Sequence, residues 1–230
     1  MLDVGSKIMR PLLIIPVIVF LTASCTTQDS KTIQTNNKFD TLPLPIDSSS
    51  FYFDTKSNWK DTVANALDTF VNSWYSKMLY ALKEPILKNY EGDKEIYRFT
   101  WLRTFNHPVS VRLEKQRETI KVFSKVCEGA GGYEPGKLVF DTTISLTQKQ
   151  IETINIRLDN AKFWTLPTES REDSGMDGSE WIIEVYKDKK YHMVVRWTPE
   201  KGTAFRAIGE SLISISQIKN ELTGRDHGDY

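Results

Sequence analysis

The 230-residue chain has few of the residues on which several protein classes depend, with two cysteines, three histidines and equal numbers of basic and acidic side chains. Two cysteines exclude a disulfide scaffold and a four-thiolate zinc site. A net charge of zero excludes a field strong enough to hold nucleic acid by electrostatics alone, so no nucleic-acid partner is expected. With 40% hydrophobic residues, the chain is typical of a globular protein of one or two domains.

Short catalytic signatures are missing as well. The sequence has no G-x-S-x-G, H-E-x-x-H or C-x-x-C segment, and each of these marks a nucleophile or a metal site. The glycine-rich loop at 129–136 lacks the Lys-Ser/Thr pair that a phosphate-binding loop needs. The sequence therefore predicts no cofactor, and no activity follows from its motifs.

The first 25 residues have the layout of a secretory signal peptide. Lys7 and Arg10 precede the apolar run at 11–21, which ends in small or hydroxylated residues and Cys25. The run is about half the ~20 residues that a membrane-spanning helix requires. The sequence therefore predicts export. One alternative is an ordinary secreted protein, in which a cysteine lies near the cleavage site by chance.

The residues at 21–25, Leu-Thr-Ala-Ser-Cys, resemble the lipobox of bacterial lipoproteins. The resemblance implies a diacylglyceryl group on the Cys25 thiol and cleavage after Ser24. The family usually has leucine three residues before the cysteine, where this chain has Thr22. Each buried methylene contributes about 0.8 kcal/mol, so two or three acyl chains would anchor the protein in the lipid bilayer. Thr26 after the cysteine is compatible with sorting to the outer membrane.

Composition divides the chain into four segments. We expect a lipoprotein signal peptide at 1–24 and a flexible tether at 25–57, because residues after the cysteine are mostly polar. The aromatic group at 51–53 is expected to dock on the domain. A single domain at 58–223 and a disordered tail at 224–230 complete the chain.

Hydrophobic periodicity predicts the elements of this domain. Apolar residues from Trp59 to Leu82 recur at three- and four-residue steps, which predicts a helix at 58–83 that Pro85 ends. Alternating residues predict four strands, which would form an antiparallel meander. These strands are expected at 97–105, 109–113, 120–127 and 137–144.

The same reasoning predicts a helix, a hairpin and a last helix in the second half of the domain. Thr147 and Gln150 match a capping box at the start of a helix whose buried stripe includes Ile151, Ile154 and Leu158. Two further strands at 181–185 and 191–197 form a hairpin, and a last helix at 205–222 stops at Gly224. The order predicts an α+β fold, with a mostly antiparallel sheet of about six strands covered on one face by about three helices.

One polar group on the second hairpin is a candidate site. We expect Glu184, His192 and Arg196 to project from the face opposite Trp181, Ile183 and Trp197. If that face closes onto a cleft, the three side chains suit an anionic or sugar-like ligand, or acid-base catalysis with Glu180 or Asp177 as a second carboxylate. The alternative is the water-facing side of an amphipathic hairpin.

A second candidate is a metal site. Asp173, Asp177 and Glu184 have the spacing of a calcium-binding loop. The third position of the motif is Gly175, however, and the residues that follow alternate as a strand where the motif requires a helix. The alternative is a solvated acidic loop that leads into the hairpin.

Charge is unevenly distributed along the chain. The segment 94–125 has eight basic and three acidic residues, and the segment 169–188 has seven acidic and two basic residues. Attraction between these two segments within the molecule is the simpler interpretation. The alternative, a basic surface for an acidic glycan or a partner protein, is weakened because Arg98 and Arg103 fall on opposite faces of one strand. Cys127 is expected to be a buried, inert thiol.

The residues at 177–184, with Tyr191-His192 and the segment 196–199, are similar to a pattern in uncharacterised bacterial proteins. That resemblance implies no activity. The leading interpretation is a membrane-anchored cell-envelope lipoprotein that binds or supports an envelope protein or glycan without catalysis. The alternative is a hydrolase or carbohydrate-active enzyme that uses the hairpin at 180–197. A third interpretation, an inhibitor or assembly factor, requires a large exposed apolar patch.

Overall fold

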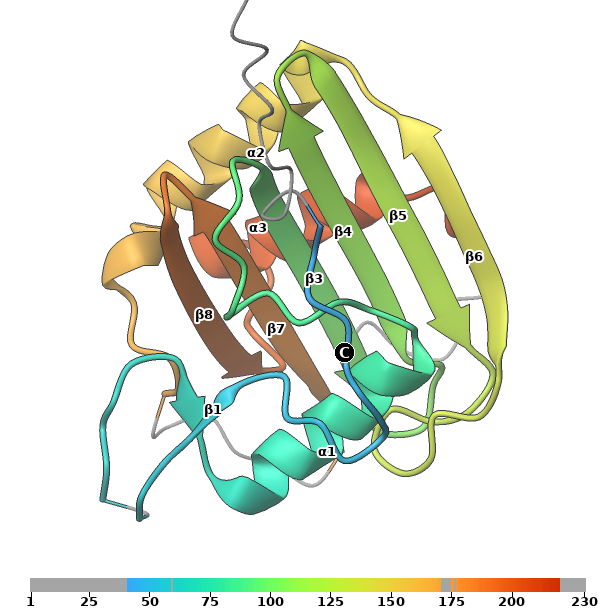
Figure 1. The fold of residues 1–230 in the computed structure, drawn as a ribbon, viewed down its shortest axis with the longest axis vertical. Helices are drawn as coiled ribbons and strands as arrows, with labels where there is room; N and C mark the ends of the chain where they lie inside the picture. The colour runs from blue at the N-terminus through green and yellow to red at the C-terminus, as the bar shows by residue number, and fades with distance from the viewer. Residues whose placement is uncertain (1–40, 59, 171–174, 176, 220–230) are drawn as a thin grey trace, which may run out of the picture. The chain divides into compact units, whose positions relative to one another are not determined.

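The structure is a computed structural model that describes residues 41–58, 60–170, 175 and 177–219. Six strands form one antiparallel sheet in the order β6-β5-β4-β3-β7-β8 (Figure 1). The strands of this sheet are β3 (Glu95–Arg103), β4 (Val109–Gln116), β5 (Thr119–Cys127), β6 (Leu138–Ser145), β7 (Ser179–Lys187) and β8 (Lys190–Trp197). The helices are α1 (Thr69–Ala81), α2 (Gln148–Asn160) and α3 (Ala204–Ser214), and the smaller elements are β1 (Asp54–Thr55), β2 (Ala66–Leu67) and η2 (Phe163–Thr165).

The predicted α+β class, the meander and the second hairpin are confirmed, but the prediction that helices cover only one face is wrong. Helices α2 and α3 pack on one face, and α1 lies on the other face together with the chain that precedes it (Figure 1). The reason is that the central strand β3 is buried on both sides. Its residues Ile96 and Leu102 point away from α2 and α3 and need a second apolar layer.

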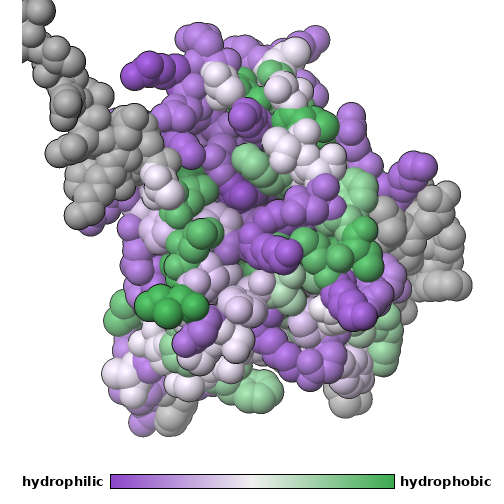
Figure 2. Space-filling view, turned by 45° about the vertical axis from the view of Figure 1, so that its right-hand side comes forward, coloured by the Kyte–Doolittle hydropathy of each residue, from purple (hydrophilic) through white to green (hydrophobic). Residues whose placement is uncertain are grey.

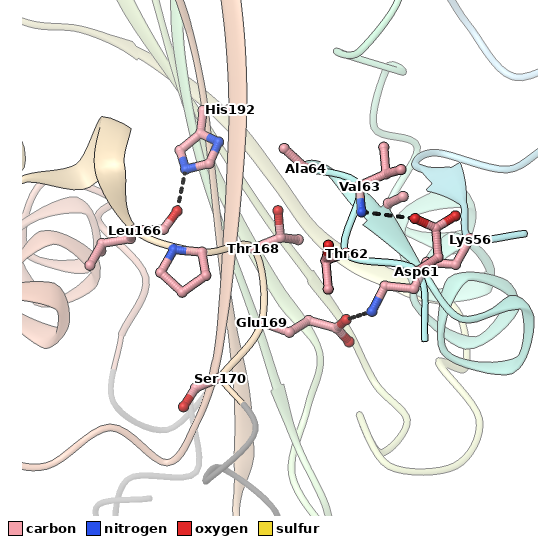
Figure 3. Close-up of a pocket in the computed structure, with 12 residues that line it drawn as sticks. Lys56, Asp61, Thr62, Val63, Ala64, Leu166, Thr168, Glu169, Ser170 and His192 are labelled. Atoms are coloured by element: carbon pink, nitrogen blue, oxygen red, sulfur yellow. Dashed lines mark hydrogen bonds and ion pairs between the residues drawn. The ribbon is translucent and has the colours of Figure 1, made fainter. Parts of the chain in front are cut away.

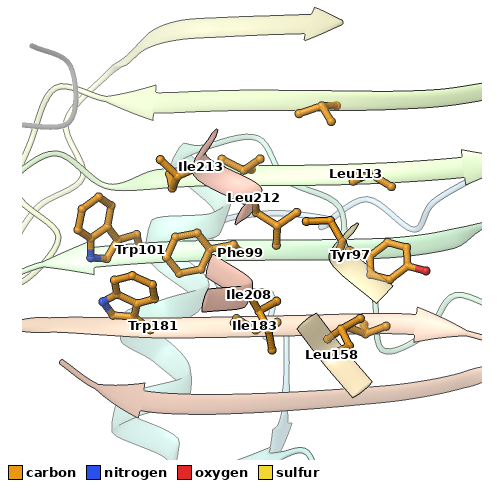
Figure 4. Close-up of a cluster of buried hydrophobic side chains, with 14 of the residues drawn as sticks. Tyr97, Phe99, Trp101, Leu113, Leu158, Trp181, Ile183, Ile208, Leu212 and Ile213 are labelled. Carbon is orange, nitrogen blue, oxygen red and sulfur yellow. The ribbon is translucent and has the colours of Figure 1, made fainter. Parts of the chain in front are cut away.

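Aromatic side chains fill the core between the sheet and helices α2 and α3. Phe99, Trp101 and Trp181 lie in mutual contact, with ring centroids 4.8 to 6.3 Å apart. Ile208 and Leu212 of α3 cover these rings, and Leu158 of α2 packs further along the sheet (Figure 4). This core fixes the strands from which the candidate sites project.

Helix α1 is shorter than predicted. It begins after Asp68, whose carboxylate accepts a hydrogen bond from the Phe70 amide at 2.8 Å. Residues 66–67 form β2, which pairs with β1 in a small parallel sheet. Val63 and Phe70 belonged to the predicted stripe, yet they are 57% and 77% exposed. The helical spacing before Asp68 was therefore a coincidence that a strong N-cap overrides. Trp59 lies outside the described residues.

The tether boundary at residue 57 is also wrong, because the chain joins the domain earlier. Tyr52 and Phe53 are fully buried, and the Tyr52 hydroxyl donates to the Glu84 carbonyl at 2.7 Å. The predicted docking of this aromatic group is confirmed for these two residues, whereas Phe51 is 39% exposed. The signal peptide at 1–24, Cys25 and the tail at 224–230 lie outside the described residues.

The last two helices differ from prediction in one respect. The capping glutamine Gln150 accepts from the Thr147 amide at 3.0 Å, as expected. Helix α3 ends at Ser214 instead of continuing to residue 222, and the chain turns at Gln217, which has a φ of 58°. Ile218 still packs on the core from outside the helix. Among the described residues, no helix combines the length and apolar character needed to cross a bilayer.

Candidate functional site

The register of the second hairpin separates the three residues of the predicted polar group. Val185 pairs with His192, and Glu184 pairs with Met193. Residues paired across strands share a face of the sheet, so His192 lies on the face of α2 and α3 and Glu184 on the face of α1. Arg196 pairs with Trp181 and shares the face of His192. The prediction that Glu184, His192 and Arg196 share a face is therefore wrong.

Glu184 is fully buried in an ion pair with Arg98. Arg98 donates from Nε and Nη2 to the two carboxylate oxygens at 2.6 and 2.7 Å, and the Tyr191 hydroxyl donates at 2.9 Å. Burial raises the pKa of Glu184, while Arg98 and Tyr191 oppose this effect. With all its bonds internal and no exposed surface, Glu184 is not placed to act on a ligand.

A second carboxylate extends the same buried network. Glu84 is fully buried and accepts from Arg112 Nε at 2.7 Å, with Lys125 Nζ at 3.2 Å and Arg98 Nη1 at 3.6 Å. Burial alone would raise the pKa of Glu84, but the three cations together lower it. Three basic side chains of the 94–125 segment, Arg98, Arg112 and Lys125, are thus used inside the molecule. The predicted attraction between the basic and acidic segments is confirmed by the Arg98–Glu184 pair, and Arg98 and Arg112 offer no surface to a glycan.

Glu184, the last ligand of the calcium-loop hypothesis, is buried in the ion pair with Arg98 and is not available to a metal ion. Glu184 sits on strand β7 with Arg98, and Asp177 is in the exposed loop before the strand. Glu180, the other carboxylate, lies on the face of Glu184 and hydrogen-bonds with Tyr75. Asp173 lies outside the described residues. Within the described part of the chain, no group of three or more His, Cys, Asp or Glu side chains could hold a metal ion.

His192 connects two loops that are far apart in the sequence. Its Nδ1 lies 3.0 Å from Asn65 Oδ1, and its Nε2 lies 2.9 Å from the Leu166 carbonyl oxygen. Asn65, with a φ of 63°, also accepts from the Met193 amide at 2.8 Å. The pKa of His192 is lowered overall. Burial is the main cause and the Arg196 guanidinium adds to it, while the hydrogen bond to the Leu166 carbonyl opposes them. His192 therefore holds the loops of Asn65 and Leu166 together at this end of β8.

These two loops form the walls of a cleft of about 730 Å³. One wall is formed by Lys56 and the segment 61–66, and the other by the segment 166–170 together with His192 (Figure 3). Lys56 on the first wall and Glu169 on the second point toward each other and form an ion pair. The Thr168 hydroxyl accepts from the Asn65 amide at 2.7 Å. This cleft is the candidate functional site.

The two carboxylates that line the cleft, Glu169 and Asp61, both have partners within the described part of the chain. Glu169 is paired with Lys56, and Asp61 accepts from its own loop. The Ser57 hydroxyl and the amides of Ser57 and Val63 lower the pKa of Asp61. Cys127 is buried, as predicted, and burial raises the pKa of its thiol to about 11.

Sequence reasoning missed this cleft. Lys56 was assigned to the tether, Asp61 and Asn65 to a helix, and Glu169 to a polar loop. The one local signal was a pair of turn-forming residues, Asp61 and Asn65, within an otherwise helical spacing.

Neither the protein-family models nor the curated proteins include a match to this chain. The residues and their geometry are therefore the basis for the function proposed below.

Proposed function

We propose that the chain is a cell-envelope lipoprotein, anchored in the lipid bilayer through acylated Cys25, whose domain binds an envelope protein or glycan without catalysis. The observation that carries the anchor is Cys25 directly after an apolar run and small residues. Thr26 supports placement in the outer membrane. The cleft between the wall of Lys56 and residues 61–66 and the wall of residues 166–170 is the binding site in this proposal.

Two features favour binding over the hydrolase alternative. The residues on which that alternative depended are divided between the faces of the sheet, with Glu184 on one and His192 on the other. One of the contacts that join the cleft walls is the partly exposed ion pair Lys56–Glu169. Such a pair contributes little to stability, so a polar ligand can replace it at small cost. On the face drawn in Figure 2, hydrophobic side chains lie in separate groups among hydrophilic ones, so this face does not have the large apolar patch that the assembly-factor interpretation requires.

Acylation is tested by metabolic labelling with a palmitate analogue. We expect labelled, membrane-associated protein from the wild type and no label in Cys25→Ala, because the Cys25 thiol is the acceptor of the lipid. Cys127→Ala is the matched control, since it removes the other cysteine of the chain and should keep the label. Equal labelling of Cys25→Ala and wild type would contradict the anchor.

Binding in the cleft is tested by photo-crosslinking in the native envelope. A benzoylphenylalanine at Thr62, an exposed residue of the cleft wall, should give a discrete adduct. The same probe at Ile156, 59% exposed on α2, is the control and should give none. Lys56→Ala and Glu169→Ala, each made with the probe at Thr62, should change the adduct yield. Adducts of equal yield at Thr62 and Ile156 would remove the cleft from the proposal.

A further inference from the structure

A second hollow of about 590 Å³ lies between the end of α1, the start of β6 and the entering chain. Its lining includes Leu44, Pro45, Tyr80 and Leu138. Leu44 is 71% exposed, and the next apolar residue along the chain, Ile46, is 96% exposed. Exposed apolar side chains that cluster beside a hollow mark a candidate surface for contact with a protein or a membrane.

The charges around this hollow are basic. Lys83 and Lys137 line it and are exposed. The acid among the lining residues, Glu84, is fully buried and already bound by Arg112 and Lys125. An apolar surface with a basic rim matches the boundary between anionic headgroups and acyl chains.

The course of the chain brings a bilayer to this surface. Leu42 packs on the domain, and the Pro43 carbonyl accepts from the Ile86 amide at 2.8 Å. Leu42 is seventeen residues after Cys25, so an anchored Cys25 lies at most roughly 60 Å from it along the chain. Leu44 and Ile46 are thus among the first domain residues beyond the anchor. Tethering raises the local concentration of the bilayer at this surface, so weak contacts suffice.

We propose that Leu44, Ile46 and the hollow beside them dock on the bilayer that holds Cys25, with Lys83 and Lys137 at the anionic headgroups. This inference rests on the proposed acylation of Cys25. Docking would fix the orientation of the domain relative to the membrane, whereas a tether alone would let it turn freely.

The test uses the acylated full chain in vesicles of phosphatidylethanolamine and phosphatidylglycerol, with a nitroxide on Ile46→Cys. Ile156→Cys on α2, which covers the other face of the sheet, is the matched control. Cys127 is buried and the pKa of its thiol is raised, so the nitroxide reagent reacts with the introduced cysteine instead of Cys127. We expect the ratio of oxygen to nickel-chelate collisions to rise about threefold or more at position 46 and to stay aqueous at 156, because interfacial apolar groups lie below the headgroups.

Charge reversal supplies a second variant. Lys83→Glu with Lys137→Glu should return the label at position 46 to aqueous values, because both exposed lysines then repel phosphatidylglycerol. An aqueous label at position 46 on vesicle-bound wild-type protein would overturn the docking and leave the anchor intact. Recovery of the chain in the soluble fraction would overturn the anchor and the docking together. Protection from both collision reagents would indicate a protein contact and overturn the lipid assignment.

Discussion

Arg98→Ala is expected to lower the free energy of unfolding by about 3–5 kcal/mol, because it leaves a buried carboxylate without its partner. Arg98 makes two of the three hydrogen bonds to Glu184, also donates to the Pro85 carbonyl at 2.6 Å, and has no exposed surface. Urea titration of the variant and wild type at pH 8 measures the loss. Lys77→Ala is the control, because its pair with Glu134 is exposed and should change stability by less than about 1 kcal/mol.

The loss in Arg98→Ala should also depend on pH. Burial raises the pKa of Glu184 above its ordinary value of 4.5, and removal of Arg98 takes away the main group that opposes this shift. The folded variant then binds more protons than the unfolded chain at pH values above 4.5. Its stability relative to wild type should therefore increase as the pH falls from 8 toward 5.

A paired replacement separates charge from packing. Arg98→Met with Glu184→Leu removes both charges, and we expect it to recover part of the stability that Arg98→Ala loses. A loss in Arg98→Ala no larger than that of Lys77→Ala would contradict the buried-pair argument. So would a loss that stays constant between pH 5 and pH 8.

The strands were predictable because their pattern is local, whereas the faces of the hairpin were not. Period-two alternation identified both strands at 179–197. Their pairing depends on the turn, and the residues at 187–190, Lys-Asp-Lys-Lys, contain no glycine or asparagine to indicate its length. Asp188 and Lys189 both have positive φ and form a two-residue turn. This register sets even-numbered residues of β7 opposite odd-numbered residues of β8, which moved His192 to the other face.

The candidate cleft could not be predicted from the sequence, for a different reason. Its two walls are joined by residues far apart in the chain, since Lys56 and Glu169 are 113 positions apart. Nothing in the local sequence of either wall indicates the other, and only the packing of η2 and β8 brings them together around His192. The charge pattern did predict a contact, because the basic and the acidic segment lie on neighbouring strands and Arg98 pairs with Glu184.

Trp181→Ala is expected to cost about 3–5 kcal/mol, the usual loss when a large aromatic side chain leaves a cavity. Trp181 is 2% exposed, its Nε1 donates to Ser179 Oγ at 2.9 Å, and Phe99 packs on its ring. Thermal and urea unfolding measure the effect. Trp164, 39% exposed, is the control of the same residue type, and Trp164→Ala should lose much less. Equal losses in the two variants would contradict the assignment of Trp181 to the centre of the core.

Gly209 provides an independent check of this packing, because it lies directly against the Trp181 ring. A Cβ at position 209 would lie 2.6 Å from the Trp181 ring, so Gly209→Ala forces the helix or the ring to move. In Trp181→Phe the smaller ring relieves this contact. Gly209→Ala should therefore destabilise the Trp181→Phe protein less than it destabilises wild type, and a double-mutant cycle measures the difference. Strictly additive losses would mean that the two residues do not touch, and that α3 does not rest on this ring.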